Sequence, residues 1–397
     1  MSVECSDLRF SERILLGPGP STADPRVLRA MNTPILGYMD PDYQQTMQDV
    51  VELLRYTFQT QNEATFPVQG TGFSGMDSCL GSLIEPEDKV IIAVNGFFGG
   101  RMCDMAERYG ARVVRLDQEW GKAFPTEVIE EALRKHSDAK LFALVHAETS
   151  TGVCQPLDRI GQLCQECGPL FLVDTVTSLG GCPLYVDAWG IDICYSGSQK
   201  CLGCPPGMAP LTLNDRALGV IAERRRKPAS YYLDLSLIKD YWNEKRVYHH
   251  TGPAAMVYGL REALRILAEE ELENRWQRHA KNASALRAGL EALGLELFAD
   301  RDCRLPSLTT VRLKESMEDA PLRRRLLREF NLEVGGGLGP IAGQIWRIGL
   351  MGYASTRRNV MYFFSALESL LQDLGSLKEV GQGLAAAQRV YLDQKGG

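Results

Sequence analysis

Residues 171–207 read FLVDTVTSLGGCPLYVDAWGIDICYSGSQKCLGCPPG, and this stretch decides the fold. It contains two short apolar runs, 171–173 and 191–195, and each of them ends abruptly at polar residues. Runs of this kind are typical of buried strands in a largely parallel sheet. Ligands of such sheets bind beyond the carboxyl ends of the strands. We therefore expect Asp174 and Lys200, which are 26 residues apart in the sequence, to meet in one crevice.

A carboxylate and an amine delivered to the same crevice suit pyridoxal 5'-phosphate (PLP). Lys200 would form a Schiff base with this cofactor, and Asp174 would keep its pyridine nitrogen protonated so that the ring can accept electrons. Taken singly, an aspartate after a strand or a lysine in a loop is more often a cap or a solvated charge. The pair gains weight from the small residues before the lysine and from the Pro-Pro-Gly turn at 205–207 after it.

The motifs VDTVTSLGG, YSGSQK and PPG, with the spacing between them, resemble the class V aminotransferases of PLP fold type I. The resemblance runs from about residue 15 to about residue 371, and within the family it is greatest to the alanine–glyoxylate (serine–pyruvate) aminotransferases. It implies an α/β fold, in which a large PLP-binding domain has a mostly parallel, seven-stranded sheet flanked by helices and a smaller α/β domain follows. We expect residues 1–270 to form the N-terminal segment and the large domain, and residues 271–397 to form the small domain.

Alternating strand and helix patterns support this architecture, because a βαβ rhythm favours a parallel sheet with helices on both faces. In the first half of the chain, strands are expected at 89–94, 112–116 and 140–145 and helices at 98–109 and 126–135. In the last quarter, strands are expected at 295–298, 308–313, 332–334 and 345–348, with helices at 320–330 and 355–371. The second series predicts a smaller unit with its own core.

Residues 67–74, PVQGTGFS, predict a strand, a glycine-rich turn and the start of a helix. Such a turn forms an anion site, because free backbone N–H groups and the helix dipole face the ligand. The pattern is neither a P-loop nor a dinucleotide fingerprint. The resemblance implies that Thr71 and Gly72 hold the cofactor phosphate together with Gln199. It also places Phe73 at the cofactor, although Phe73 departs from the smaller or polar residues expected there.

The resemblance implies further cofactor contacts. Phe98 would stack on the pyridine ring in the offset geometry that aromatic pairs prefer. Thr149, in the motif HAETSTG, would hydrogen-bond the 3'-oxygen, and Val176 is expected among the remaining contacts. Tyr248 and Thr251 are implied to reach the phosphate of the cofactor in a neighbouring subunit. A homodimer with shared active sites is therefore expected.

Two residues are expected to contact the substrate. Arg347 lies in an apolar strand pattern, where a buried arginine is rarely unpaired, and its rigid fork suits a carboxylate. The resemblance makes Arg347 the residue that docks the substrate's α-carboxylate. Tyr38 lies in a loop that borders the substrate pocket in this family, at a position where the glyoxylate enzymes commonly carry His. Together these residues predict transamination from a small amino acid, alanine or serine, to glyoxylate or a similar 2-oxo acid.

Three alternatives remain open at this point. The second half and the tail also resemble ureidoglycine–glyoxylate aminotransferases, although Tyr38 stands where Gln is expected in that subgroup and Tyr248 stands where Asn is expected. A class V lyase or desulfurase usually needs an extra mobile cysteine or acid, and neither Cys201 nor Cys303 lies in a desulfurase pattern. A PLP fold reused as a regulator or scaffold is disfavoured, because every expected cofactor residue is present and no DNA-binding extension precedes the motifs.

Composition excludes several other partners. The 397 residues carry 44 basic and 50 acidic side chains, and the net charge of −6 offers no general attraction to nucleic acid or anionic membranes. No signal peptide, spanning segment or anchor is visible, so a cytoplasmic protein is expected. The 11 cysteines fit reduced, buried thiols. The pairs Cys164/Cys167 and Cys201/Cys204 lie too far apart in sequence for a typical zinc site, so no metal is expected.

Overall fold

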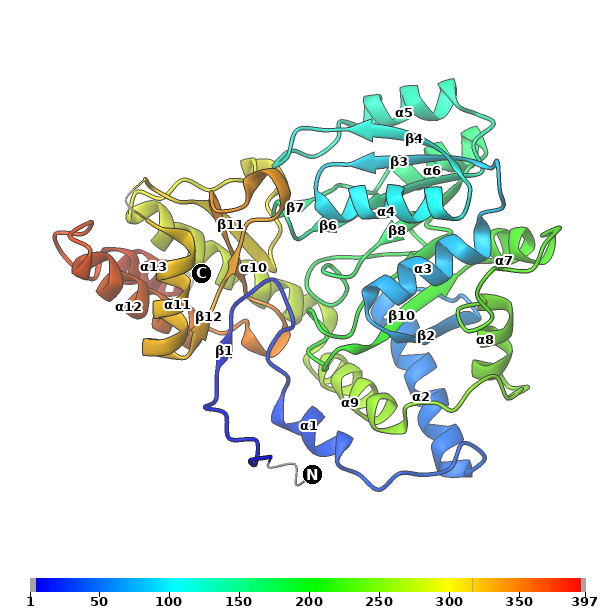
Figure 1. Cartoon of the computed structure of the whole chain (residues 1–397), viewed down its shortest axis with the longest axis horizontal. Helices are drawn as coiled ribbons and strands as arrows, with labels where there is room; N and C mark the ends of the chain where they lie inside the picture. The colour runs from blue at the N-terminus through cyan, green and yellow to red at the C-terminus, as the bar shows by residue number, and fades with distance from the viewer. Residues whose placement is uncertain (1–4, 316, 394–397) are drawn as a thin grey trace.

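The structure, a computed structural model, describes residues 5–315 and 317–393. It has a large unit built on a seven-stranded sheet and a smaller unit built around a three-stranded sheet (Figure 1). This arrangement confirms the predicted α/β fold. The domain boundary at residue 270 stays a prediction. No helix in the described part of the chain is long and apolar enough to cross a membrane.

The seven-stranded sheet is mostly parallel, as predicted. In spatial order its strands are β2 (Ala64–Gly70), β10 (Gly207–Leu213), β9 (Ile193–Tyr195), β8 (Leu170–Asp174), β5 (Leu141–Val145), β3 (Lys89–Val94) and β4 (Arg112–Asp117). Only β10 runs antiparallel to its neighbours, β2 and β9. Every residue of the central strands β5 and β8 is buried. Their sequences are continuously apolar because helices cover both faces of the sheet, so neither face of these strands is exposed to solvent.

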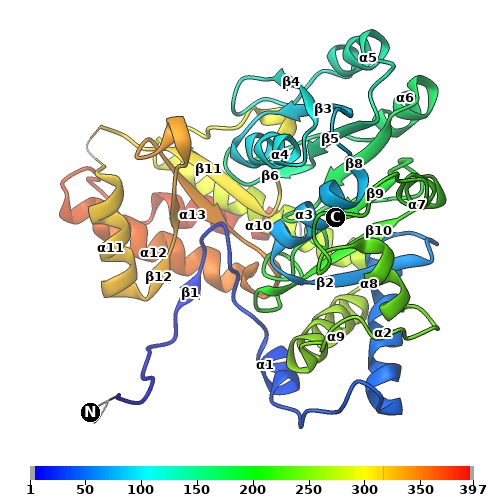
Figure 2. The same ribbon diagram turned by 45° about the vertical axis from the view of Figure 1, so that its right-hand side comes forward.

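Helices flank the large sheet (Figure 2). They are α1 (Pro25–Met31), α2 (Pro41–Phe58), α3 (Gly72–Leu83), α4 (Phe97–Arg108), α5 (Thr126–Lys135), α6 (Ile160–Cys167), α7 (Asp215–Ala222), α8 (Leu235–Trp242) and α9 (Ala254–Glu270). Helix α3 packs on β2, β9 and β10, and α4 packs on β3, β4 and β5. Both helices begin directly after a strand of the sheet, so their N-termini lie at the edge where the parallel strands end.

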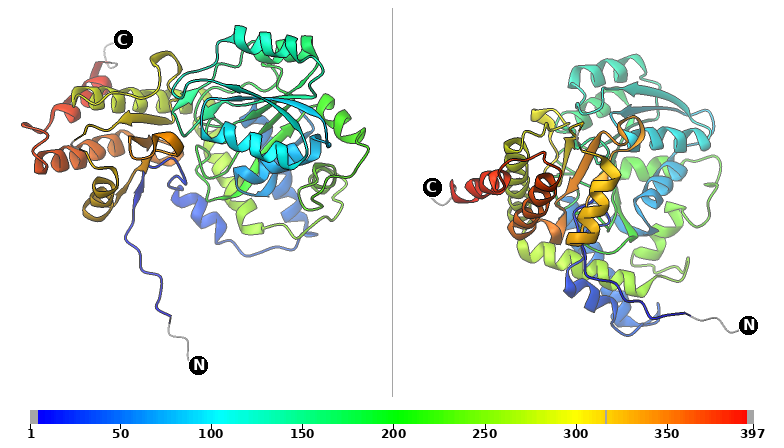
Figure 3. Two further views of the ribbon diagram at one scale, coloured as in Figure 1. Left: turned by 45° about the horizontal axis from the view of Figure 1, so that its top comes forward. Right: turned by 60° about the vertical axis from the view of Figure 1, so that its left-hand side comes forward.

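The smaller unit has helices packed around the sheet β11–β14–β13 (Figure 3). The strands are β11 (Leu308–Arg312), β13 (Gly335–Gly336) and β14 (Ile345–Gly349), and the helices are α10 (Leu272–Ala292), α11 (Asp319–Phe330), α12 (Arg357–Asp373) and α13 (Gln382–Leu392). Near the N-terminus, β1 (Ile14–Leu15) pairs in parallel with β12 (Leu332–Glu333). Leu16 lies in the apolar core of this smaller unit. The N-terminal segment therefore crosses from the small unit to the large one.

The predicted strand at 295–298 is wrong. Only Leu297 forms a bridge, to Val311, beside an otherwise irregular segment. Two backbone hydrogen bonds join the segment to β11, from Phe298 to Thr310 and from Arg312 to Glu296. The pairing extends no further, because the chain turns at Gly294 (φ 67°) before it and enters a short 3-10 helix at Arg301–Cys303 after it.

Candidate active site

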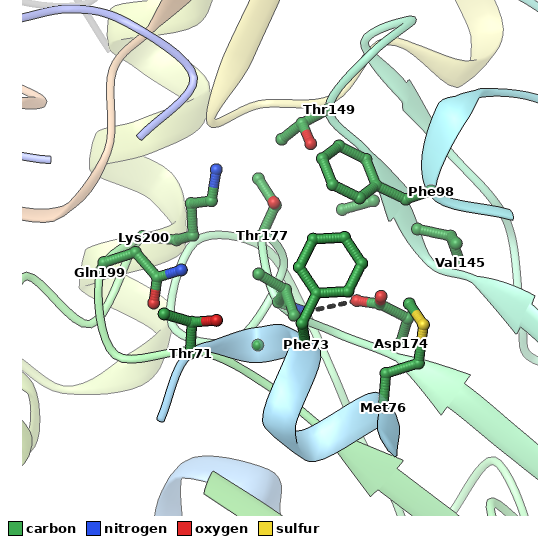
Figure 4. Close-up of a pocket in the computed structure, with 13 residues that line it drawn as sticks. Thr71, Phe73, Met76, Phe98, Val145, Thr149, Asp174, Thr177, Gln199 and Lys200 are labelled. Atoms are coloured by element: carbon green, nitrogen blue, oxygen red, sulfur yellow. Dashed lines mark hydrogen bonds between the residues drawn. The ribbon is translucent and has the colours of Figure 1, made fainter. Parts of the chain in front are cut away.

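A cavity of about 180 Å³ lies where the parallel strands β5, β8 and β9 end. It contains both Asp174, the last residue of β8, and Lys200, which lies in the loop that follows β9. The residues that line it are Thr71, Gly72, Phe73, Met76, Phe98, Val145, Ala147, Thr149, Asp174, Val176, Thr177, Gln199 and Lys200. Figure 4 shows Lys200, Gln199 and Thr71 on one side of the cavity and Asp174 and Phe98 on the other, with the ring of Phe73 between them.

Lys200 is buried beneath the N-terminal segment. Its Nζ donates a hydrogen bond to the backbone oxygen of Pro18. Gly19 passes so close that a Cβ there would lie 2.6 Å from the same Nζ, and its φ of 117° also favours glycine. Burial, together with the charge of the nearby Arg347, lowers the pKa of Lys200 to about 8. A neutral amine is therefore accessible close to neutral pH.

Asp174 is held by two hydrogen bonds, one to each carboxylate oxygen. The backbone N–H of Val176 donates to Oδ1 at 2.8 Å, and the hydroxyl of Tyr195 donates to Oδ2 at 2.8 Å (Figure 4 shows the first of these). Burial raises the pKa of Asp174 to about 6, against the opposing effect of these two bonds. Sequence analysis missed Tyr195. The feature that could have identified Tyr195 is the parallel register of β8 and β9, which places Tyr195 directly opposite Asp174.

One end of the cavity is built to receive an anion. Helix α3 begins at Gly72, and the first N–H groups of a helix have no intrahelical acceptor. Thr71 is the N-cap residue, yet its side chain makes no capping hydrogen bond. Among the described residues, Oε1 of Gln199 is buried without a hydrogen-bond partner. The helix N–H groups, the hydroxyl of Thr71 and the amide NH2 of Gln199 are donors that a ligand's phosphate would satisfy, whereas Oε1 of Gln199 is itself an acceptor.

Two aromatic rings face the middle of the cavity. The ring centroids of Phe73 and Phe98 are 6.1 Å apart, and the ring planes are tilted by 42°. Phe73 is 43% exposed, so its ring is free to adjust to a ligand. The backbone N–H of Phe98 donates to the carboxylate of Glu148 at 3.0 Å, which fixes the start of α4 at the cavity.

Glu148 is a further organising residue that sequence analysis quoted within a motif without giving it a role. It is fully buried in the hairpin formed by β6 (Ala147–Glu148) and β7 (Val153–Cys154). One oxygen accepts from the N–H groups of Phe98 and Gly99, and the other accepts from the N–H and the hydroxyl of Ser150. Glu148 therefore ties α4 to the hairpin that carries Thr149.

Arg347 lies on β14 just beyond the lining residues of the cavity. It is 7% exposed, and it donates to the backbone oxygens of Gly336, at 2.7 Å, and Thr149, at 3.4 Å. No carboxylate of the described residues forms an ion pair with it. Burial lowers the pKa of Arg347 to about 10. A buried guanidinium without a carboxylate partner is costly, and a substrate carboxylate would relieve that cost.

Tyr38, Tyr248 and Thr251 lie outside the cavity of their own chain. The rings of Tyr38 and Tyr248 are 5.0 Å apart, and the hydroxyls of Tyr248 and Thr251 are 3.3 Å apart. The two tyrosines are 44% and 54% exposed. The structure therefore groups the three residues with one another on the surface and does not bring them to Lys200.

Nearly the whole chain is similar to known aminotransferases. The family model described as aminotransferase class-V matches residues 18–358. The (S)-ureidoglycine–glyoxylate transaminase of Bacillus subtilis is 43% identical, over 96% of this chain and 95% of that protein. The alanine–glyoxylate aminotransferase of Callithrix jacchus is also 43% identical, over 92% of this chain and 89% of that protein. The crystal structure of an alanine–glyoxylate aminotransferase from Nostoc sp. matches with a TM-score of 0.91 at 49% identity, covering 93% of this chain and 98% of that one.

Proposed function

Because this chain belongs to the class V aminotransferase family and is a PLP-dependent aminotransferase, we propose that it moves an amino group from a small amino acid, alanine or serine, to glyoxylate or a similar 2-oxo acid. The observation that carries this proposal is the single cavity that holds Lys200 and Asp174 on opposite sides, with the aromatic rings of Phe73 and Phe98 in its lining. The relatives named for glyoxylate transamination support glyoxylate as the acceptor.

The residues of the cavity fit the cofactor. The N–H groups at the start of α3, the hydroxyl of Thr71 and the amide NH2 of Gln199 would donate to its phosphate, and Asp174 would pair with its ring nitrogen. Phe98 would contact its ring, and Lys200 would attach to its aldehyde carbon. When bound, PLP supplies an electron sink for the negative charge that develops at the substrate's α-carbon.

Lys200 would be the proton carrier of the reaction. Its pKa of about 8 allows Nζ to accept a proton from the α-carbon and to give it back near neutral pH. Arg347 would bind the α-carboxylate, which fixes the orientation of the substrate in the cavity. The carboxylate of Asp174, oriented by Val176 and Tyr195, would keep a negative charge at the far side of the cavity.

Ureidoglycine is a second candidate for the amino donor, because the Bacillus subtilis relative named for that substrate is 43% identical. Purified protein should be assayed with alanine, serine and ureidoglycine as donors, with glyoxylate and pyruvate as acceptors. We expect the highest kcat/KM with alanine or serine and glyoxylate. A higher kcat/KM with ureidoglycine would select the second candidate.

We propose a cytoplasmic location on separate grounds. All 11 cysteines are free thiols in the structure, and most of them are buried. Proteins of reducing compartments keep their thiols in this state, whereas secreted proteins commonly pair them.

We also propose a homodimer whose active sites are shared. Tyr38, Tyr248 and Thr251 form an exposed polar and aromatic group that lies outside the cavity of its own chain. A hydrogen bond links this group to β2, since the side-chain amide of Gln69 donates to the backbone oxygen of Thr251. In a symmetric dimer, the same surface of one subunit meets its copy in the other. Tyr248 and Thr251 would then reach the phosphate end of the partner's cavity.

Mixing two inactive variants tests the shared sites. Lys200→Ala chains should lose activity, and chains with Tyr248→Phe and Thr251→Ala should bind the phosphate poorly. After subunit exchange, each heterodimer would contain one intact site, so activity should recover to about one quarter of the wild-type value at an equimolar ratio. Full activity of the double variant alone, or mixtures that stay inactive although mass analysis shows heterodimers, would contradict the shared site.

Tyr38 should tune the choice of donor. If it enters the partner's pocket beside Tyr248, its phenol narrows the space for the donor side chain. Tyr38→His should then raise kcat/KM for larger donors relative to alanine, by about ten- to two-hundredfold at most. Relative kcat/KM values for alanine, serine and larger amino acids measure the effect, with Tyr362→His as the matched control on α12. An unchanged ranking of donors in Tyr38→His would rule out this role.

A further inference from the structure

A cluster of one histidine and two cysteines lies behind the hairpin that carries Thr149. His146 follows β5, Cys154 ends β7 opposite Ala147, and Cys182 lies in the long loop between β8 and β9. Nitrogen and sulfur atoms of these three side chains lie within 4.8 Å of one another. None of the three lines the cavity of the active site. The proposed transamination therefore gives this cluster no task.

The contacts of the His146 ring indicate which of its nitrogens carries the proton. Its Nε2 lies 3.5 Å from Sγ of Cys154, and its buried Nδ1 has no partner among the described residues. Buried N–H groups are almost always paired. We therefore place the ring proton on Nε2, from which it is donated to the sulfur of Cys154. Cys182 has one thiol proton with two acceptors within reach, the backbone oxygen of Ser178, 3.7 Å from its Sγ, and the sulfur of Cys154.

The contact between the two thiols shifts their pKa values in opposite directions. Interaction with the Cys182 thiol and with His146 holds the pKa of Cys154 well below its usual range, against the opposing effect of burial. The same contact with Cys154, and burial, hold the pKa of Cys182 well above its usual range. A thiolate beside a protonated thiol is the arrangement of an attacking and a resolving cysteine.

We propose that Cys154 and Cys182 form a hydroperoxide-sensitive thiol pair that closes to a disulfide. The Cys154 thiolate attacks the peroxide, so that an S–O bond forms and the O–O bond breaks. The leaving oxygen takes up a proton and departs as water or an alcohol, and the peroxide is reduced as the sulfur is oxidised. The sulfur of Cys182 then displaces the hydroxyl group from Cys154. An S–S bond forms, the S–O bond breaks, and water leaves with the proton of Cys182.

The pair connects two segments that border the active site. Cys154 belongs to the hairpin whose tip carries Thr149. Cys182 follows Gly181, where a Cβ would collide with Sγ of Cys201, the residue after Lys200. Closing a disulfide between the two segments would therefore restrain the hairpin against the β8–β9 loop, which packs on Cys201 next to the catalytic lysine.

Peptide mapping of the reduced holoenzyme tests the pair directly. After treatment with hydrogen peroxide and alkylation of the remaining thiols, the non-reduced digest should contain the peptides of Cys154 and Cys182 joined, and dithiothreitol should separate them. Cys182→Ser should leave a sulfenic acid on Cys154 that dimedone traps. Cys154→Ser should lose both the cross-link and the label. Cys164→Ser, which changes a buried cysteine on α6, should keep the cross-link.

Several results would overturn the pair. The proposal would be wrong if oxidised wild-type protein lacked the Cys154–Cys182 cross-link, or if Cys154→Ser still formed a cross-link to Cys182. A stoichiometric zinc ion in the purified protein that Cys154→Ser fails to hold would show instead that the cluster binds metal. His146→Leu removes the hydrogen-bond donor to Cys154. In the Cys182→Ser background it should therefore lose the fast dimedone labelling, and an unchanged labelling rate would refute the role given to His146.

Discussion

Lys200→Ala should abolish transamination, with kcat reduced by at least about a hundredfold, because positioned proton transfer alone contributes that much or more. Lys200 is the only lysine among the described residues that line the cavity, so no other amine there can carry the proton. The measurement is the steady-state rate with alanine and glyoxylate. Lys135→Ala is the matched control, since Lys135 is an exposed lysine at the end of α5, and its rate should equal that of the wild type.

The same lysine should carry the cofactor. Borohydride reduction of the holoenzyme should fix the pyridoxyl group to Lys200, and peptide mapping should find it there. The Lys200→Ala variant should contain no fixed label, although its phosphate site at Thr71 and Gly72 is unchanged. A pyridoxyl group on a different lysine of the wild type, or substantial turnover by Lys200→Ala, would remove Lys200 from the centre of the mechanism.

Much of the site could be predicted because its residues lie at the ends of parallel strands. Asp174 and Lys200 follow two neighbouring strands, and short apolar runs announce both strands in the sequence. Thr71 and Gly72 follow a third strand through a glycine-rich turn. In each case a local pattern marks the strand end, and the general geometry of parallel sheets supplies the meeting point.

The residues that sequence analysis missed act through contacts that no local pattern encodes. Tyr195 meets Asp174 only through the register of β8 and β9. Glu148 acts because the hairpin folds back onto the first turn of α4, 50 residues away from it in the chain. Pro18 reaches Lys200 across 182 residues, after β1 has paired with β12. These contacts depend on how whole elements pack, which the spacing of residues within one motif does not specify.

Asp174→Asn should lower kcat/KM by about ten- to a hundredfold, or more. The loss of one charge-assisted hydrogen bond costs about 1.5–3 kcal/mol, which sets the lower part of that range. The loss of the negative charge at the cofactor's ring nitrogen weakens the electron sink and adds to it. Near-normal turnover by Asp174→Asn would move this role to another residue.

The pH dependence of PLP affinity distinguishes the contribution of the Asp174 charge from that of the shape of its side chain. Burial raises the pKa of the free carboxyl to about 6, so it becomes neutral as the pH falls through that value and can no longer pair with a cationic ring. At pH values below about 6, the affinity of the wild type for PLP should therefore decrease relative to that of Asp174→Asn, by up to about tenfold per pH unit.

Tyr195→Phe removes a hydrogen bond that stabilises the carboxylate of Asp174. The pKa of Asp174 should therefore rise in this variant, and the decrease in PLP affinity should begin at a higher pH. Fluorescence titrations with PLP measure these differences in the apo forms of the wild type, Asp174→Asn and Tyr195→Phe. The titrations should run from about pH 5 to about pH 8, a range that spans the expected transition. Parallel pH profiles for the wild type and Asp174→Asn would show that the charge of Asp174 does not hold the cofactor.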